Sequence, residues 1–384
     1  MIIPSEFDEI RPYSPEELPQ VFEELIADPD FQSVTQLVVP DVPFEILAEK
    51  LRQCKTSLDV QKSFFYGLLH NVMKEKSDGF VMDTSSLEDK TQSHVFMSNH
   101  RDIVLDSGLL CVGLLDNGFP NTVEIAIGDN LLIHPWIKKL VRINKSIIVQ
   151  RALQMSQMRE SSVRLLRYIH FAIKEKKESV WIAQREGRAK DSNDRTQESV
   201  LKMLVLGAED HVVDRLKGLS IVPLTVSYEY DPCDFLKAKE MQLKRDIADF
   251  KKSKEDDLLN MQTGIFGYKG KVHFQTGPCI NDELETLREL PKTTIFSNVS
   301  KIIDKHIHQN YHLYPGNYIA CDKLSGKKEF ADKYTIADIT RFNAYIQQKL
   351  DLIDLPNKDE KFLRECLFTM YANPTINYMK AISK

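Results

Sequence analysis

The sequence predicts an α/β fold: a central, largely parallel mixed sheet flanked by helices, with helical N-terminal and C-terminal additions. Between residues 94 and 230, short β-rich runs alternate with helical patterns. Strands that alternate with helices form parallel sheets covered on both faces. With 384 residues, of which 42% are hydrophobic and 28% charged, the chain can also bury a core of that size.

Three regions follow from the patterns along the chain. Residues 1–85 are expected to form a helical N-terminal region, because apolar residues recur there at helical spacing. Residues 86–295 are expected to hold the α/β core, and residues 296–384 a helical C-terminal region. The polar stretch 77–93 is expected to connect the first region to the core.

Five β-rich runs predict the strands of the core. They span residues 95–97, 123–127, 146–149, 179–183 and 221–226. The last run contains Pro223, and a proline inside a strand predicts an edge position or a bulge. The charged stretch 234–259 predicts a solvated helix or hairpin, and the glycine-rich stretch 264–280 predicts a hairpin or edge strand. A helix between the third and fourth runs is expected to bury one apolar stripe, made of Met155, Met158, Leu165, Leu166, Ile169 and Ile173.

The composition excludes several classes of protein. The net charge of −5 argues against a globally basic nucleic-acid binder, so no nucleic-acid partner is expected. The six cysteines are scattered without a CxxC pair, which is typical of reduced cytosolic thiols. The N-terminus is acidic without an apolar signal segment, and no run reaches the ~18 uncharged apolar residues of a spanning helix. We therefore expect a cytoplasmic protein that does not cross a bilayer.

The stretch from Ser98 to Asp106 is the most informative for chemistry. His100 follows a predicted strand, and Asp102 and Asp106 follow shortly after it. An imidazole accepts protons at neutral pH, and a carboxylate on its second ring nitrogen fixes the tautomer and stabilises the imidazolium. Such a pair is what a general base needs to activate a hydroxyl nucleophile. The structural alternative is a capping histidine beside an aspartate at a helix N-terminus.

Three further clusters belong to the later strands. Arg151 directly follows the third strand, and residues 184–190, with a Glu-Gly turn and several cations, follow the fourth. Val222 and Pro223 lie in the fifth strand. In an open α/β sheet, ligands bind beyond the carboxyl ends of the strands, so these polar residues are expected to converge with His100.

In their order and spacing these four blocks resemble the motifs of the glycerolipid acyltransferase family, which contains lysophosphatidate and glycerol-3-phosphate acyltransferases. The similar blocks are Asn99-His100 with Asp106 (Asn-His-x4-Asp in the family), Lys145 to Arg151, Gln184 to Arg188 (Phe-Pro-Glu-Gly-Thr-Arg), and Val222-Pro223 (Val-Pro). They cover residues 94 to 226, roughly a third of the chain. Four ordered partial matches are more specific than any one of them.

The chain departs from the family pattern at two places that concern the site. Five residues separate His100 from Asp106 where the family has four, so either Asp106 or Asp102 orients the imidazole; we favour Asp106. Ala189 stands at the position of the family's arginine, so Arg188 or Lys190 is expected to bind the phosphate instead.

The resemblance implies an O-acyltransferase of phospholipid biosynthesis. It would move a fatty acyl group from a thioester donor, acyl-CoA or acyl carrier protein, to a hydroxyl of 1-acylglycerol-3-phosphate, with no further cofactor and no metal. His100 would remove the hydroxyl proton, Arg151 and Arg188 would clamp the acceptor's phosphate or carboxylate, and Glu186 with the Gly187 backbone would orient the hydroxyl. Glycerol-3-phosphate or a non-phosphate lyso-lipid as acceptor, or a catalytically degenerate lipid-binding scaffold, are the alternatives.

A substrate of this kind requires contact with a membrane surface. From His134 to Arg159 there are six Lys or Arg and no Asp or Glu. Trp136, Ile137 and Leu140 are interleaved with the first of these cations. An aromatic, basic, amphipathic segment suits an anionic lipid surface and predicts peripheral attachment to the inner face of the membrane. A basic helix packed on the sheet is the structural alternative.

Metal chemistry is a weaker hypothesis. Residues 99–102 and 128–130 superficially resemble elements of metal-dependent phosphoesterases, but their order is reversed and no Asp-x-His opens the set. His306, His308 and His312 have the spacing of a metal cluster. Without a cysteine or a nearby convergent carboxylate pattern, they are expected to be histidines on a helix surface.

Overall fold

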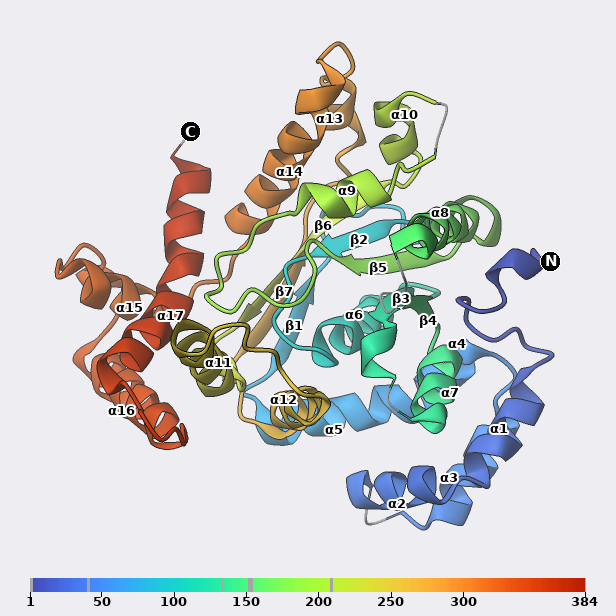
Figure 1. Cartoon of the computed structure of the whole chain (residues 1–384), viewed down its shortest axis with the longest axis horizontal. Helices are drawn as coiled ribbons and strands as arrows, with labels where there is room; N and C mark the ends of the chain where they lie inside the picture. The colour runs from blue at the N-terminus through green and yellow to red at the C-terminus, as the bar shows by residue number, and fades with distance from the viewer. Residues whose placement is uncertain (1–2, 40–41, 133, 151–154, 208–209, 384) are drawn as a thin grey trace.

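A seven-stranded mixed sheet forms the centre of the protein (Figure 1), whose computed structural model describes residues 3–39, 42–132, 134–150, 155–207 and 210–383. The strands lie in the order β1-β7-β6-β2-β5-β3-β4. Their bounds are β1 Phe80–Asp83, β2 Val95–Ser98, β3 Val123–Gly128, β4 Ser146–Val149, β5 Ser179–Ala183, β6 Ile221–Tyr228 and β7 Val272–Thr276. Neighbouring strands are parallel except β6 and β7, which are antiparallel. The predicted fold class is confirmed.

All five predicted strands are present, as β2 to β6, but one edge of the sheet differs from the prediction. The stretch 77–93, expected to be a connector, contains β1, which pairs in parallel with β7. β1 therefore occupies the edge, and the prediction of a hairpin or edge strand over 264–280 was wrong, because β7 lies between β1 and β6. β1 has only four residues, too few for an alternating pattern to stand out from a polar stretch.

The prediction for Pro223 was also wrong, because its strand lies inside the sheet. The register pairs Leu224 with Thr276, which places Pro223 opposite Gly277, just beyond the end of β7. The Gly277 N–H donates to the Pro223 carbonyl at 2.7 Å. The Gly277 carbonyl has no proline N–H to accept, and it accepts the Ser86 hydroxyl instead at 2.8 Å. The Gly277 carbonyl therefore has a partner although proline lacks the N–H group, which is why this internal strand tolerates Pro223.

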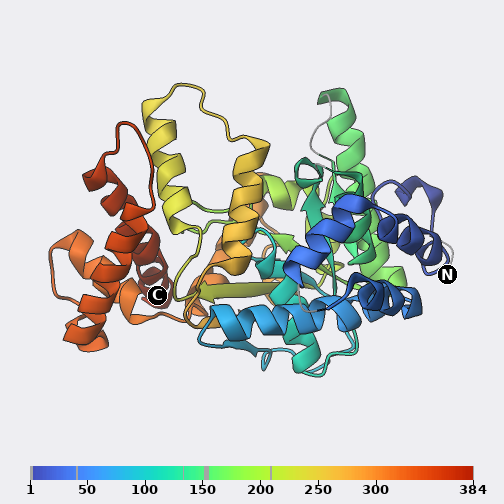
Figure 2. The same cartoon turned by 90° about the horizontal axis from the view of Figure 1, so that it is seen from below.

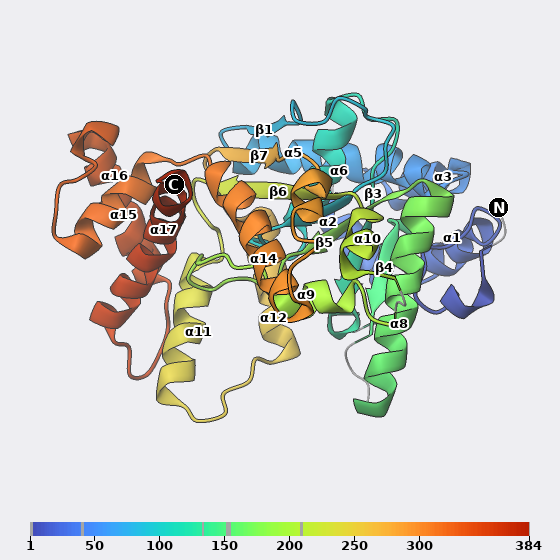
Figure 3. The same cartoon turned by 90° about the horizontal axis from the view of Figure 1, so that it is seen from above.

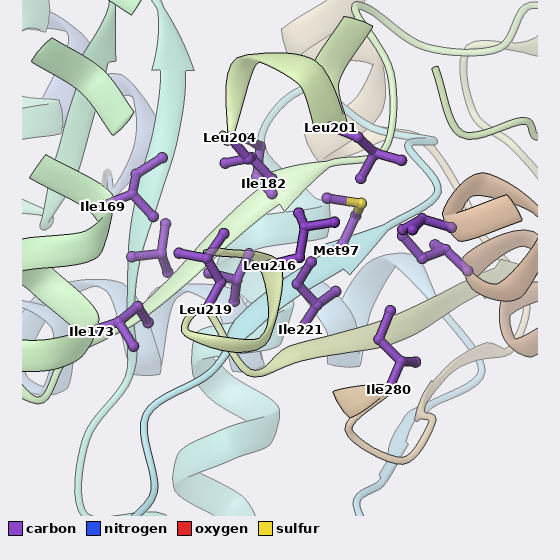
Figure 4. Close-up of a cluster of buried hydrophobic side chains, with 14 of the residues drawn as sticks. Met97, Ile169, Ile173, Ile182, Leu201, Leu204, Leu216, Leu219, Ile221 and Ile280 are labelled. Atoms are coloured by element: carbon purple, nitrogen blue, oxygen red, sulfur yellow. The ribbon is translucent and has the colours of Figure 1, made fainter. Parts of the chain in front are cut away.

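Side chains that alternate along the strands build a hydrophobic core on each face of the sheet. Val95 and Met97 of β2 face one core, and Phe96 between them faces the other. Figure 4 shows the first core, where Met97 and Ile182 of the sheet meet residues of the covering helices. Those helices are α8 Met155–Phe171, α9 Glu198–Met203, α10 Val212–Lys217 and α14 Lys292–Gln309. The second face is covered by α5 Tyr66–Lys76 and α6 Leu105–Asp116.

The helix that follows β4 carries most of the apolar stripe predicted for it. Leu165, Leu166, Ile169 and Ile173 are buried. Met158 is 47% exposed and lies outside the core, which corrects its assignment to the buried stripe. The side chain of Met155 lies outside the described residues.

Helices form separate clusters at the two ends of the chain, as expected. At the N-terminal end, α1 Leu18–Ile26, α2 Pro29–Val38, α3 Phe44–Gln53 and α4 Ser57–Val60 build a small core with α7 Pro135–Ile143. At the C-terminal end, α15 Pro315–Ser325, α16 Ile336–Asp351 and α17 Glu360–Ile382 build another. A short α13 Asn281–Glu285 precedes α14. Nowhere in the described ranges does a helix have the length and apolar character to span a membrane.

The charged stretch after β6 forms two helices, α11 Asp234–Asp246 and α12 Lys254–Phe266. Figures 2 and 3 show them side by side, with their connecting loop at the free end, away from the sheet. This agrees with the predicted helix or hairpin, but the stretch is not wholly solvated. Asp234 and Lys237 in α11 and Gly264 in α12 are buried, so this helix pair packs against the loops that follow the strands.

Candidate active site

His100 lies in the loop between the end of β2 and the start of α6. Because β2 lies between β5 and β6, this loop emerges where the loops of both neighbours also leave the sheet. Trp181 of β5 meets the imidazole edge to face, with ring centroids 5.6 Å apart. The Trp181 indole N–H also donates to Ser98 Oγ at 3.0 Å, which fixes the end of β2 just before His100.

Asp106 is the carboxylate that contacts His100. His100 Nδ1 lies 2.8 Å from Asp106 Oδ2, and the same oxygen accepts the backbone N–H groups of Arg101 at 2.6 Å and Asp102 at 3.0 Å. The other oxygen accepts the Tyr228 hydroxyl at 3.2 Å. Asp106 is fully buried, and these four groups hold its carboxylate in one orientation.

The second ring nitrogen of His100 is the one left for chemistry. Because Nδ1 faces a carboxylate, Nδ1 carries the proton in the neutral ring and Nε2 has a free lone pair. Within the described ranges, no hydrogen bond involves Nε2, and the side chain is 13% exposed. An imidazole oriented in this way can accept, at its Nε2 atom, the proton of a hydroxyl group. Asp106 then stabilises the imidazolium that results.

Asp102, the other carboxylate considered for this role, opens the helix instead. Its Oδ1 accepts the backbone N–H groups of Val104 at 2.8 Å and Leu105 at 2.7 Å, the amides at the start of α6. Burial raises the pKa of Asp102 above its usual value, and the nearby charge of Asp106 adds to the increase. Asp102 therefore shapes the loop around His100 without contacting the imidazole through a hydrogen bond in the described structure.

Asp102 also packs directly against α12. A Cβ atom added to Gly264 would lie 1.9 Å from Asp102 Oδ2, far below any allowed contact. We expect Gly264→Ala to lower the free energy of unfolding by about 1–3 kcal/mol, because the added methyl group displaces Asp102 or α12. Gly67→Ala is the matched control: that helical glycine has nothing within 4 Å of its Cβ position. There alanine is expected to stabilise the protein by about 0.5–1 kcal/mol. Urea unfolding of both variants checks this, and equal stabilities would contradict the contact.

Arg188, in the loop after β5, also contacts α12. Its side chain is buried, and Nη2 donates to Asn260 Oδ1 at 3.0 Å. Nη1 is buried too, and no acceptor for it is found in the described part of the chain. The Arg188 charge acts on Asp102, whose pKa it lowers against the stronger effect of burial. A buried guanidinium with an unpaired Nη1 can bind an oxygen of an anionic ligand.

Of the remaining predicted site residues, the structure describes Lys190, Gly187 and Glu186. Lys190 pairs with Glu240 of α11 at 2.8 Å, and burial, with the nearby charge of Arg188, lowers its pKa to about 8. The Gly187 backbone adopts φ +65°, which favours glycine, and the Glu186 N–H donates to Gln197 Oε1 at 2.8 Å. Arg151 lies outside the described residues.

The basic segment predicted to meet a membrane makes many contacts within the protein. Trp136 and Leu140 pack against the N-terminal helices, and Lys139 pairs with Glu24 at 2.8 Å. Arg142 and Lys145 are buried. Arg142 and Lys145 are therefore not available to a lipid surface, and the membrane contact stays a prediction.

The three C-terminal histidines have separate partners. His306 pairs with Glu283 at 2.6 Å, and His308 is buried, which corrects its expected place on a helix surface. The ring of His312 lies 4.8 Å from that of His273. Within the described residues, no group of three or more His, Cys, Asp or Glu side chains is arranged to hold a metal ion.

Two of the groups that sequence reasoning missed hold Asp106 and the neighbours of His100. Tyr228 at the end of β6 reaches Asp106, and Asp194 in the loop after β5 binds both neighbours of His100. Neither lies in a block that resembles a known motif. Asp194 follows the predicted cationic turn by a few residues, and that position is the only signal that could have pointed to it.

Comparisons with known proteins found similarity among solved structures. No family model matches the chain, and a search of curated proteins found no match. Among solved structures, the chain is similar to the 1-acyl-sn-glycerophosphate acyltransferase PlsC from Thermotoga maritima. The similarity covers 75% of this chain and 98% of that chain, at 13% identity and a TM-score of 0.36. Similarity at this level identifies neither a reaction nor a substrate.

Proposed function

We propose that the protein is an O-acyltransferase that moves a fatty acyl group from a thioester to a hydroxyl of a glycerophosphate-type acceptor. The observation that carries the proposal is the contact of His100 Nδ1 with Asp106 Oδ2 at 2.8 Å, at the carboxyl end of a central strand. It gives chemical meaning to the ordered motifs that resemble the glycerolipid acyltransferase family.

The reaction needs only groups that lie in this region. His100 Nε2 accepts the proton of the acceptor hydroxyl as the oxygen attacks the thioester carbonyl carbon. The new C–O bond forms, the C–S bond breaks, and the departing thiolate takes the proton from the imidazolium. Asp106 stabilises the imidazolium during the transfer.

Arg188 is the residue we propose for the acceptor's phosphate. Its unpaired Nη1 is suited to a phosphate oxygen, and Glu186 with the Gly187 backbone would orient the hydroxyl. Within the proposal, 1-acylglycerol-3-phosphate is the acceptor, and acyl-CoA or acyl-acyl carrier protein is the donor. The protein would then act in phospholipid biosynthesis, peripherally on the inner face of the membrane in the cytoplasm, with Arg151 as a second phosphate ligand.

A donor-by-acceptor panel tests the function. Acyl-CoA and acyl-acyl carrier protein are each combined with 1-acylglycerol-3-phosphate, glycerol-3-phosphate and a non-phosphate lyso-lipid, and products are identified by mass spectrometry. His100→Ala protein serves as the blank. An acylated product that appears only with the wild-type protein supports the proposal. Lipid binding without acyl transfer from either donor would favour a lipid-binding scaffold instead.

Replacing Arg188 tests how the acceptor is bound. We expect Arg188→Ala to raise the acceptor KM by about 10–100-fold with little change in kcat, because one charge-assisted hydrogen bond contributes about 1.5–3 kcal/mol. Arg288→Ala is the control, since that arginine pairs with Asp214 and Glu285 on the surface. Steady-state kinetics with varied acceptor give both constants. An unchanged acceptor KM in Arg188→Ala would remove Arg188 from the acceptor site.

A further inference from the structure

Asp194 binds the two residues that flank His100 in the sequence. It is fully buried in the loop between β5 and α9. Its carboxylate accepts two N–H groups of Arg101, at 2.9 and 2.6 Å, in a bidentate ion pair. The same carboxylate accepts the Asn99 amide at 3.3 Å. One side chain therefore holds the residue before and the residue after the proposed general base.

Groups from the C-terminal part of the chain fix Asp194 in turn. The Tyr311 hydroxyl donates to Asp194 Oδ2, and His308 Nε2 lies 2.9 Å from the Asp194 carbonyl oxygen. Burial, with the nearby charge of Asp194, raises the pKa of Tyr311 well above its usual value, so this hydroxyl keeps its proton and acts as a donor. Each of the two carboxylate oxygens thus has at least one donor.

Asn99 links this carboxylate to the sheet. Its Oδ1 accepts the Val226 N–H at 2.8 Å, and its Nδ2 donates to the Val226 carbonyl at 2.9 Å. Val226 belongs to β6, the strand beside β2. On the other side of His100, the Arg101 carbonyl accepts Lys237 Nζ of α11 at 3.0 Å. The backbone on both sides of the imidazole is therefore tied to rigid elements.

We propose that Asp194 is a positioning residue, which acts on the reaction by holding Asn99 and Arg101 so that His100 meets Asp106. In the described structure no hydrogen bond joins Asp194 to the imidazole, so its effect passes through the two neighbours. The inference rests on the proposed function for its kinetic consequence. A displacement of about 1 Å in such a site can lower the rate about 100-fold.

The test compares two ion pairs, each formed by a buried cation. Asp194→Asn removes the charge opposite Arg101. Glu178→Gln makes the same change in the pair of Glu178 with the buried Lys145, 2.6 Å apart at the amino ends of β4 and β5, far from the loop of His100. We expect Asp194→Asn to lower kcat by about 10–100-fold with the acceptor KM within about twofold of wild type. Glu178→Gln is expected to keep kcat near the wild-type value, with both variants assayed below their unfolding temperatures.

A second readout needs no substrate. In protein labelled with ¹⁵N-histidine, the Nδ1–H signal of His100 is assigned as the one missing from His100→Ala. We expect Asp194→Asn to lose or broaden this signal, because the imidazole no longer keeps its contact with Asp106, and Glu178→Gln to retain it. If Asp194→Asn does not fold, Tyr311→Phe takes its place. That variant removes one donor to Asp194 and leaves the ion pair with Arg101, so a smaller loss of signal and of kcat is expected.

Two results would overturn the inference: an intact His100 signal with wild-type kcat in Asp194→Asn, or equal losses in Asp194→Asn and Glu178→Gln. If Tyr311→Phe has to replace Asp194→Asn, an unchanged His100 signal together with an unchanged kcat would overturn the inference as well. Failure of the proposed function looks different. In that case the wild-type protein transfers no acyl group, and the comparison of His100 signals alone decides whether Asp194 positions the imidazole.

Discussion

Replacing His100 with alanine is expected to lower kcat for acyl transfer by about 10²–10⁴-fold, the usual contribution of a positioned general base. The variant loses the only nitrogen that the structure offers to the acceptor hydroxyl from this loop, while Asp106 keeps three other hydrogen-bond donors. The acceptor KM is expected to change little, because the imidazole acts on the hydroxyl in the transition state. The measurement is the initial rate with the donor and acceptor that the panel identifies.

A second histidine–aspartate pair provides the control for this variant. His70 of α5 lies 3.4 Å from Asp116 at the far end of α6, in an exposed position. His70→Ala therefore removes the same kind of pair without touching the loop of His100, and wild-type kcat is expected. Unfolding temperatures of both variants show whether either change disturbs the fold. A fully active His100→Ala protein would end the proposal, whatever the fate of His70→Ala.

The parts of the fold that sequence predicted well are those with a strong local pattern. β4 and β5 have the predicted bounds, because each is a short apolar run between polar residues. The contact of His100 with Asp106 was also accessible from sequence, since both lie in one loop and the first turn of the helix that follows. Local spacing is enough to bring such residues together.

The parts that sequence missed depend on segments far apart in the chain. The position of Pro223 inside the sheet required the Ser86 hydroxyl, which belongs to the loop after the unpredicted β1. The surroundings of Asp102 required Gly264, and those of His100 required Asp194. In each case a short contact joins two segments that meet only because whole helices and strands pack together. No periodicity or motif in either segment predicts such a contact.

The same substitution, made separately at Asp102 in the loop and at Asp106 in the first turn of α6, distinguishes the roles of the two aspartates. In Asp106→Asn, the amide oxygen can remain on the side of the Arg101 and Asp102 N–H groups, and the amide nitrogen can donate to the Tyr228 hydroxyl. The geometry is kept and the charge beside the imidazolium is lost, so we expect kcat to fall by about 10²–10⁴-fold with little loss of stability.

Asp102→Asn is expected to behave in the opposite way. Asparagine accepts backbone N–H groups at a helix start as well as aspartate does, so Val104 and Leu105 keep their acceptor. The substitution also leaves the pair of His100 and Asp106 intact, because in the described structure Asp102 makes no hydrogen bond with the imidazole. We therefore expect kcat close to wild type in Asp102→Asn, measured beside Asp106→Asn under identical conditions. A larger loss of kcat in Asp102→Asn than in Asp106→Asn would contradict this assignment. Proton transfer would then depend more on Asp102 than on the contact between His100 and Asp106.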